Sequence, residues 1–172
     1  MKKLRKALGV CLSSFISNLG DDGPVSVEHV KKIIGLGLGK AINVKGINGL
    51  TPLAAAVYGY YPEITRTLLE AGADPNKLSG RGATPLMLVC ISPSSLEWEK
   101  QSQIRMPIVE MLIKAGAIVS DTLSHPDHGS AFEIAEKMGY SQITKRLEAE
   151  ILNETAKNNI IFDLARTYLR PR

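Results

Sequence analysis

Residues 49–57 of the chain read GLTPLAAAV, and the same pattern returns 33 residues later as GATPLMLVC at 82–90. Between the two copies, residues 71–76 read AGADPN. A period of about 33 residues is typical of proteins built from small helical units that stack side by side. One such unit is too small to bury its own apolar face, so neighbouring units must pack on one another. The spacing therefore predicts an all-α solenoid that offers a binding surface and no catalytic pocket.

The unit that contains the first copy carries clear signals for two helices. Thr51 can cap a helix through its hydroxyl, and Pro52 suits the first helical position because its missing N–H costs little there. A second helix can begin at Pro62, and Gly72 offers the left-handed conformation that ends a helix. The sequence Asp74-Pro75-Asn76 then prevents any continuation. We therefore expect an inner helix, an outer helix and a turn back toward the next unit.

These features resemble the ankyrin family, whose pattern runs roughly G-x-T-P-L-H-x-A-A and then G-H-x-E-h-V-x-L-L-L-x-x-G-A-D-x-N, with h a hydrophobic residue. The matching residues are Gly49, Thr51, Pro52, Leu53, Ala56, Glu63, Ile64, Leu68, Leu69, Gly72, Ala73, Asp74 and Asn76. The His after the Leu is Ala54 here, and the Gly-His pair is Tyr60-Tyr61. The resemblance implies an ankyrin-repeat solenoid of about four helix pairs joined by β-turns, with a C-terminal helical segment.

The other units are placed by register, and together they make one expected domain, 1–172. Gly116 follows Thr84 by 32 residues, whereas Gly72 follows Thr51 by 21, so about 11 residues are inserted in the third unit. The expected parts are an N-terminal capping helix pair (1–43), a repeat (44–76), a repeat with an insertion at 92–107 (77–120), a divergent C-terminal repeat (121–152) and a helical extension (153–172). Asn43 stands 33 residues before Asn76, in register.

Both ends of the chain carry amphipathic segments. Apolar residues at helical spacing in 4–15 and 27–38 predict the first helix pair. Apolar residues recur in 160–169 after a polar stretch. This last segment is expected to cap the open end of the stack, or else to dock a partner as a helix in a groove.

The charge balance argues against a nucleic-acid partner. The net charge is +4, from 21 basic and 17 acidic residues. Four of the basic residues lie within 2–6, and without them the solenoid has 17 of each sign. A surface that binds a nucleic-acid backbone needs an excess of basic residues along its length. We therefore expect no nucleic-acid partner.

Compartment and membrane signals favour a cytoplasmic protein. The basic start followed by an apolar run resembles a signal peptide, but Gly9 and neighbouring serines dilute the run and no typical cleavage site follows. No apolar run approaches the ~20 residues that a membrane span requires. Cys11 and Cys90 lie among apolar helical neighbours and are expected to be buried thiols in a reducing compartment. Secretion into a host cell is the alternative localisation.

The sequence carries no convincing signal for a catalytic or metal site. His125 and His128 have H-x-x-H spacing with Asp127 nearby, yet the segment reads as an enlarged turn with solvated histidines. The glycines before Lys40 end a helix, so they do not form a phosphate loop. No nucleophile, His and carboxylate show a hydrolase spacing. The sequence therefore predicts no enzyme, no cofactor and no metal.

The resemblance places partner binding on the turn tips and the exposed side of the inner helices. The turn-tip residues are Ile47, Asn48, Leu50, Gly80, Arg81 and Ala83, and the inner-helix ends carry Tyr58, Tyr60 and Ser92. Trp98 lies in the insertion, where it is expected either to contact a partner beside the groove or to fold back on apolar neighbours. Tyrosine and tryptophan suit such contacts because they bring large area at low entropic cost.

Three functions are compatible with these residues. The first is a non-catalytic module that binds, scaffolds or inhibits a partner protein, most simply as a monomer. The second is a microbial effector delivered to a host cell, or a toxin-neutralising protein, because small stand-alone ankyrin proteins occur in both roles. The third is a self-assembling structural protein whose copies pair through 4–15 and 160–169.

Overall fold

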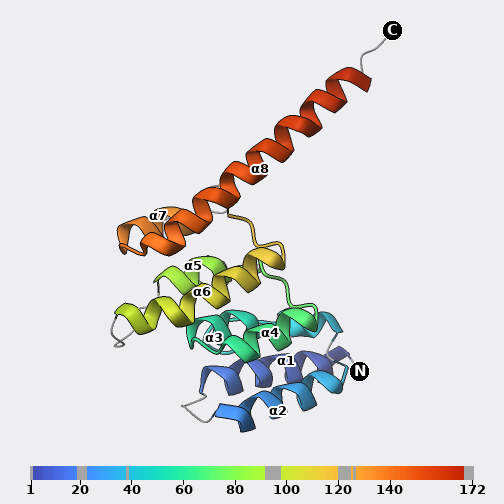
Figure 1. Ribbon diagram of the computed structural model, residues 1–172. Helices are drawn as coiled ribbons and strands as arrows, with labels where there is room; N and C mark the ends of the chain where they lie inside the picture. The colour runs from blue at the N-terminus through green and yellow to red at the C-terminus, as the bar shows by residue number, and fades with distance from the viewer. Residues whose placement is uncertain are drawn as a thin grey trace.

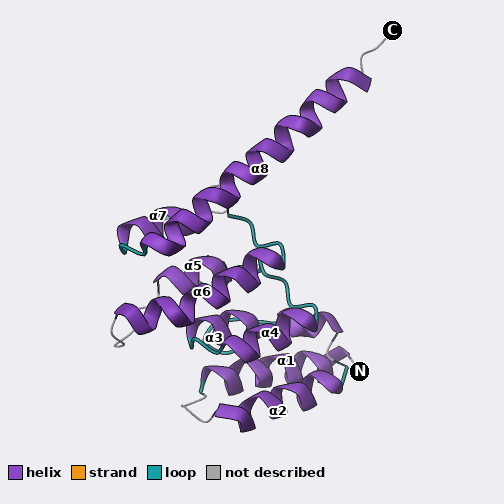
Figure 2. Cartoon of the chain, viewed as in Figure 1, coloured by secondary structure: helices purple, strands orange, loops and turns teal. Residues whose placement is uncertain are grey.

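The computed structural model describes residues 2–18, 23–37, 39–91, 98–119, 125 and 127–168. Within these ranges the elements are α1 (Lys2–Ser17), α2 (Gly23–Gly35), the 3-10 helix η1 (Gly39–Asn43), α3 (Pro52–Tyr58), α4 (Pro62–Glu70), α5 (Pro85–Ile91), α6 (Trp98–Lys114), α7 (Ala131–Lys137) and α8 (Ser141–Tyr168). The described chain consists of helices and loops, and it contains no strand (Figure 2). The predicted all-α class is confirmed.

The helices form two rows. The inner helices α1, α3, α5 and α7 contact one another in that order, and the outer helices α2, α4, α6 and α8 do the same (Figure 1). Each inner helix is antiparallel to the outer helix that follows it, as the short connections require. The predicted solenoid of helix pairs is thus confirmed in the described part of the chain.

The inner helices α3, α5 and α7 begin at side-chain caps. The Thr51 Oγ1 accepts a hydrogen bond from the Ala54 N–H at 3.1 Å, and Thr84 caps α5 in the same way. In the divergent unit, Ser130 replaces the threonine and forms a reciprocal capping box with Glu133. The predicted cap at Thr51 is confirmed, and each cap fixes where the preceding turn joins its helix.

Asparagines in register connect the loops of successive units. The Asn43 Oδ1 accepts from the Asp74 N–H at 2.8 Å, and the Asn76 Oδ1 accepts from the Ile118 N–H at 2.8 Å. Gly72 has a φ of +85°, as predicted for a helix-ending glycine. The 33-residue register of the two asparagines is therefore a repeating hydrogen bond between neighbouring units.

A buried arginine joins three units. Arg105, on α6, is 1% exposed, and its guanidinium carbon lies 4.7 Å from the ring centroid of Tyr60 and 4.6 Å from that of Tyr140. Its Nη1 donates to the Val89 carbonyl. Tyr60 adopts a φ of +57°, a left-handed conformation that favours glycine, at the place where the ankyrin pattern has glycine. Tyr60, expected at the binding surface, therefore packs between units.

The insertion differs from expectation. The register places residues 92–107 as an insertion within the repeat, but α6 runs without a break from Trp98 to Lys114 and has 17 residues, against 9 in α4. The inserted residues from 98 onward thus lengthen the outer helix at its N-terminal end. Ser92 and the side chain of Trp98 lie outside the described residues.

The C-terminal segment also differs from expectation. The helix α8 has 28 residues and extends away from the stack, so residues 153–161 do not cap its open end (Figure 1). Leu152, Ile160 and Ile161 are exposed.

Arg146, near the start of α8, donates hydrogen bonds to Glu110 of α6 and to Glu150 of α8, and these bonds raise the pKa of Arg146. No helix in the described ranges is long and apolar enough to cross a membrane.

The N-terminal pair matches its predicted helices, with two differences. Leu12 and Ile16 of α1 and Val30 of α2 are buried. Leu4 is 64% exposed and Cys11 is exposed, so neither belongs to the core. The expectation of two buried thiols is therefore wrong for Cys11 and right for Cys90.

The two thiols are expected to differ sharply in reactivity. Burial raises the pKa of Cys90 to about 12, although the Arg105 charge opposes this shift. Because the thiolate is the reactive species, Cys90 should resist alkylation in the folded protein. Titration with an aromatic disulfide at pH 8 should find one fast thiol per chain, and a Cys11→Ser variant should show none until denaturant is added. Fast labelling of Cys90 in the folded Cys11→Ser variant would contradict the burial.

Candidate partner-binding groove

Three turns of the same build precede the inner helices α3, α5 and α7. They span 46–50, 79–83 and 125–129. In each turn the first N–H donates to the carbonyl of the fifth residue, and the fourth N–H donates to the carbonyl of the first. A glycine with positive φ lies in each turn, at 49, 82 and 129. These turns form a row along one side of the inner helices.

Hydrogen bonds hold the turns against one another. The Gly80 N–H donates to the Gly49 carbonyl at 2.7 Å, and a Cβ at Gly80 would lie only 3.1 Å from the Gly49 Cα. The Lys45 Nζ donates to the Ser79 carbonyl at 3.2 Å. The His125 Nε2 bonds the Arg81 carbonyl at 2.7 Å. The row of turns is thus fixed before any partner arrives.

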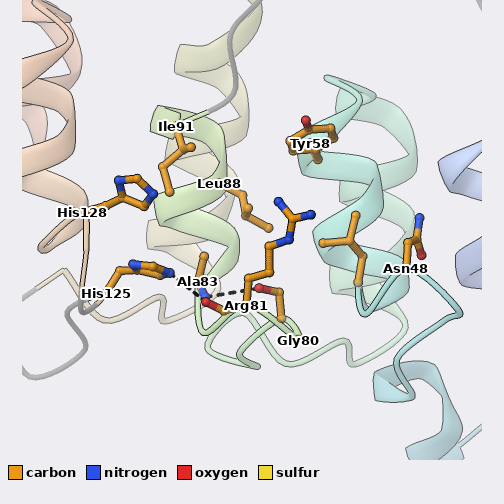
Figure 3. Close-up of a pocket in the computed structure, with 11 residues that line it drawn as sticks. Asn48, Tyr58, Gly80, Arg81, Ala83, Leu88, Ile91, His125 and His128 are labelled. Atoms are coloured by element: carbon orange, nitrogen blue, oxygen red, sulfur yellow. Dashed lines mark hydrogen bonds between the residues drawn. The ribbon is translucent and has the colours of Figure 1, made fainter.

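A groove of about 320 Å³ lies between the turns and the inner helices (Figure 3). It is lined by Asn48, Leu50, Tyr58, Ser79, Gly80, Arg81, Ala83, Leu88, Ile91, His125 and His128. The apolar wall comes from α3 and α5, and the polar wall comes from the turns. The Ser79 hydroxyl accepts a hydrogen bond from the Ala83 N–H within its own turn.

Arg81 carries the most prominent charge in the groove. Its side chain leaves the turn and points along the inner helices toward Tyr58 (Figure 3). Arg81 is exposed, and it makes no salt bridge with any residue that the structure describes. Its backbone is held on both sides, by the Gly80–Gly49 bond and by His125. The guanidinium is therefore presented to the groove from a fixed base.

His125 is a structural residue of the turn. It is 8% exposed, and its Nδ1 accepts from the Asp127 N–H at 3.1 Å. Its Nε2 must then carry the proton and donate to the Arg81 carbonyl. Both ring nitrogens are occupied, which leaves none for a metal ion. The expectation of solvated histidines is wrong for His125 and right for His128, whose exposed ring lies 4.8 Å from it, centroid to centroid.

Five of the six predicted turn-tip residues, together with Tyr58 of the inner-helix ends, meet in this groove. Asn48, Leu50, Tyr58, Gly80, Arg81 and Ala83 all line it. Ile47 is 91% exposed at the first turn but is not part of the lining. Tyr60 packs on Arg105. No group of three metal-ligating side chains occurs in the described ranges.

Sequence reasoning missed the far wall of the groove. Ile91 stands 33 residues after Tyr58, so strict use of the register would have found it in place of Ser92. His125 was missed because the third turn starts 46 residues after the second, beyond both the repeat period and the insertion. No sequence signal marked Leu88 as a lining residue rather than a core residue.

Comparisons with known proteins agree with this architecture. The family model described as "Ankyrin repeat" matches residues 48–79. The chain is 34% identical over 98 residues to ankyrin repeat and KH domain-containing protein mask-1 of Caenorhabditis elegans, covering 56% of this chain and 3% of that protein. It is 55% identical over 40 residues to NF-kappa-B inhibitor alpha of Sus scrofa, covering 23% of this chain and 13% of that protein. Residues 48–79 therefore match an ankyrin repeat, and the chain spans only a small part of the length of either relative.

Proposed function

We propose that this protein is a non-catalytic binding module that holds a partner protein in the groove between its turns and inner helices. Ankyrin repeats generally mediate protein–protein interaction, and one similar protein is named as an inhibitor of NF-kappa-B. Scaffolding, sequestration and inhibition all follow from the same binding step. A delivered effector or a toxin neutraliser would differ only in the partner that it binds. A reducing compartment such as the cytoplasm suits the protein because both cysteines are free thiols.

The observation that carries the proposal is the fixed groove itself. Its walls combine the exposed ring of Tyr58 and partly or largely buried aliphatic side chains with backbone that is already hydrogen-bonded in place. Tyr58 is 46% exposed, although it is a large side chain at the end of a buried helix. A preformed surface loses little conformational entropy when it binds. The turns and inner helices extend along the stack and can offer the roughly 800 Å² per partner of a standard interface.

The test is capture of a partner followed by mutation of the groove. Wild-type protein immobilised on beads is used to isolate a partner from cells that express this chain, and the purified partner is then titrated by calorimetry. Tyr58→Ala should weaken binding at least about tenfold, as removal of a central aromatic contact does. Arg66→Ala, on the exposed side of α4, is the matched control and should bind as wild type does. Weakening by Arg66→Ala with full binding by Tyr58→Ala would place the partner on the outer helices.

Self-assembly is a second candidate, favoured by the exposed apolar side chains of α8. Leu152, Ile160 and Ile161 lie beyond the stack without a covering element among the described residues. Light scattering of the intact chain decides between the two candidates. A monomer at high concentration removes self-assembly, and a dimer that Ile160→Asp dissolves supports it.

A further inference from the structure

We propose that the groove selects a partner segment that carries a carboxylate beside an apolar side chain, and that Arg81 binds this carboxylate. This inference rests on the proposed function and names the chemistry of its partner. It arises from the distribution of charge in the groove, from the way in which Arg81 is held and from the apolar surface beside it.

The charge in the groove is of one sign. Arg81 is a full cation, and the exposed imidazole of His128 adds polar ring nitrogens. The described lining contains no Asp or Glu. The nearby acids lie outside this lining: Asp127 belongs to the third turn, and the Glu133 carboxylate accepts from the Ser130 N–H in the cap of α7. An anionic side chain in the groove therefore meets attraction, and a cationic one meets repulsion.

Arg81 is prepared to bind a carboxylate. A guanidinium presents parallel N–H donors that match the two oxygens of a carboxylate. Arg81 makes no salt bridge within the described residues, so a partner need not displace an internal one. The Arg81 carbonyl accepts a hydrogen bond from His125, and the N–H of the preceding residue, Gly80, donates to the Gly49 carbonyl. These two bonds restrict the backbone before a partner binds. The remaining cost of ordering falls on the side chain alone.

The surface next to the guanidinium is apolar. The Arg81 side chain runs alongside Leu88 toward Tyr58, with Ile91 further along α5 (Figure 3). A segment seated here would bury an apolar side chain on this wall, and the exclusion of water would strengthen the adjacent ion pair. A carboxylate alone would leave the wall uncovered, and an apolar segment alone would leave Arg81 unpaired. The combination satisfies both.

A nucleic acid fits the same groove less well. A phosphate backbone requires a row of cations along its path. Here the lining offers one arginine and one exposed histidine beside aliphatic walls, and the chain beyond its first residues has equal numbers of acidic and basic side chains. The observations therefore favour a protein segment.

The test uses a library of random twelve-residue peptides displayed on phage. The library is selected against the intact wild-type chain, Arg81→Glu and the control Arg66→Glu, which makes the same charge reversal on the outer face. Wild type and Arg66→Glu should select peptides with Asp or Glu beside Leu, Ile, Val or Phe. Arg81→Glu should instead enrich Lys or Arg at that position. Arg81 and Arg66 are both exposed, so neither change should disturb folding, and circular dichroism checks this.

A selected peptide then permits a charge-pair test by fluorescence anisotropy. Changing its Glu to Gln, or Arg81 to Gln in the protein, should each weaken binding by about tenfold, and the two changes together should cost no more than either alone. Additive losses would overturn the inference. Equal or tighter binding of a fifteen-residue oligothymidylate, lost with Arg81→Gln, would also overturn it, in favour of a phosphate ligand.

The failure of this inference is distinguishable from that of the proposed function. Peptides that Tyr58→Ala weakens but that show no acidic preference would overturn the inference and leave the groove as the binding site. If no selected peptide is sensitive to Tyr58→Ala, both the inference and the proposed function are contradicted.

Discussion

Replacement of Arg105 by alanine is expected to lower the free energy of unfolding by about 3–5 kcal/mol. The substitution removes the guanidinium from between the rings of Tyr60 and Tyr140 and leaves a cavity there. It also leaves the Val89 carbonyl without this donor in a buried site. Urea denaturation followed by circular dichroism gives the loss. Arg66→Ala, an exposed arginine on α4, should change stability by no more than about 0.5 kcal/mol.

Two further variants show that the planar guanidinium matters and not the charge alone. Arg105→Lys keeps the charge but cannot stack flat between two rings while bonding Val89, so it should lose most of the same stability. In a double-mutant cycle, Arg105→Ala and Tyr140→Leu should couple by about 1 kcal/mol or more. A loss below about 1 kcal/mol for Arg105→Ala would show that the arginine does not hold the units together.

The second large effect is expected for Leu68→Ala, which should cost about 2–5 kcal/mol. Leu68 of α4 is fully buried, and α4 contacts both α2 and α6 in the outer row. The truncation leaves a cavity at these contacts, and the transfer energy of the removed carbons is lost as well. Chemical denaturation measures the change under the same conditions as for Arg105.

Tyr58→Ala is the matched control for Leu68→Ala within the same unit. Tyr58 is 46% exposed and lines the groove, so its removal should cost less than about 1 kcal/mol. Comparable large losses for the two variants would assign Tyr58 to the core and remove it from the binding surface.

The features predicted correctly are those that a few neighbouring residues determine. Thr51 caps its helix because a hydroxyl three residues before an N–H can bond it, whatever the rest of the fold does. Gly72 takes a positive φ because few other residues do so at low cost. The 33-residue spacing then extends these local signals along the stack, which explains why Asn43 and Asn76 occupy equivalent places.

The features that were missed depend on residues far apart in the sequence. Arg105 is buried because it meets tyrosines from units 45 residues before it and 35 residues after it. Within its repeat, Arg105 occupies the position that Tyr61 and Tyr140 occupy in theirs. The insertion at 92–107 shifts the numbering, so this equivalence was not recognised from the sequence. The polar stretch after Leu152 suggested a break, but residues 141–168 contain no Gly or Pro, and α8 continues through it.

Part of the groove was predictable from the repeat register. Register placed Arg81 and Ala83 opposite Asn48 and Leu50, and all four line it. The enlarged third turn broke that register, so His125 was assigned to solvent. Its burial follows from the bond to the Arg81 carbonyl, which only the folded stack brings within reach.

The most direct test of the groove as the binding site is photo-crosslinking with benzoylphenylalanine. The photoreactive residue replaces Tyr58 in the groove in one variant and Arg66 on α4 in another, and each intact chain is irradiated with the captured partner. The proposed function predicts a crosslinked product from position 58 and none from position 66. A product from position 66 with none from position 58 would contradict it.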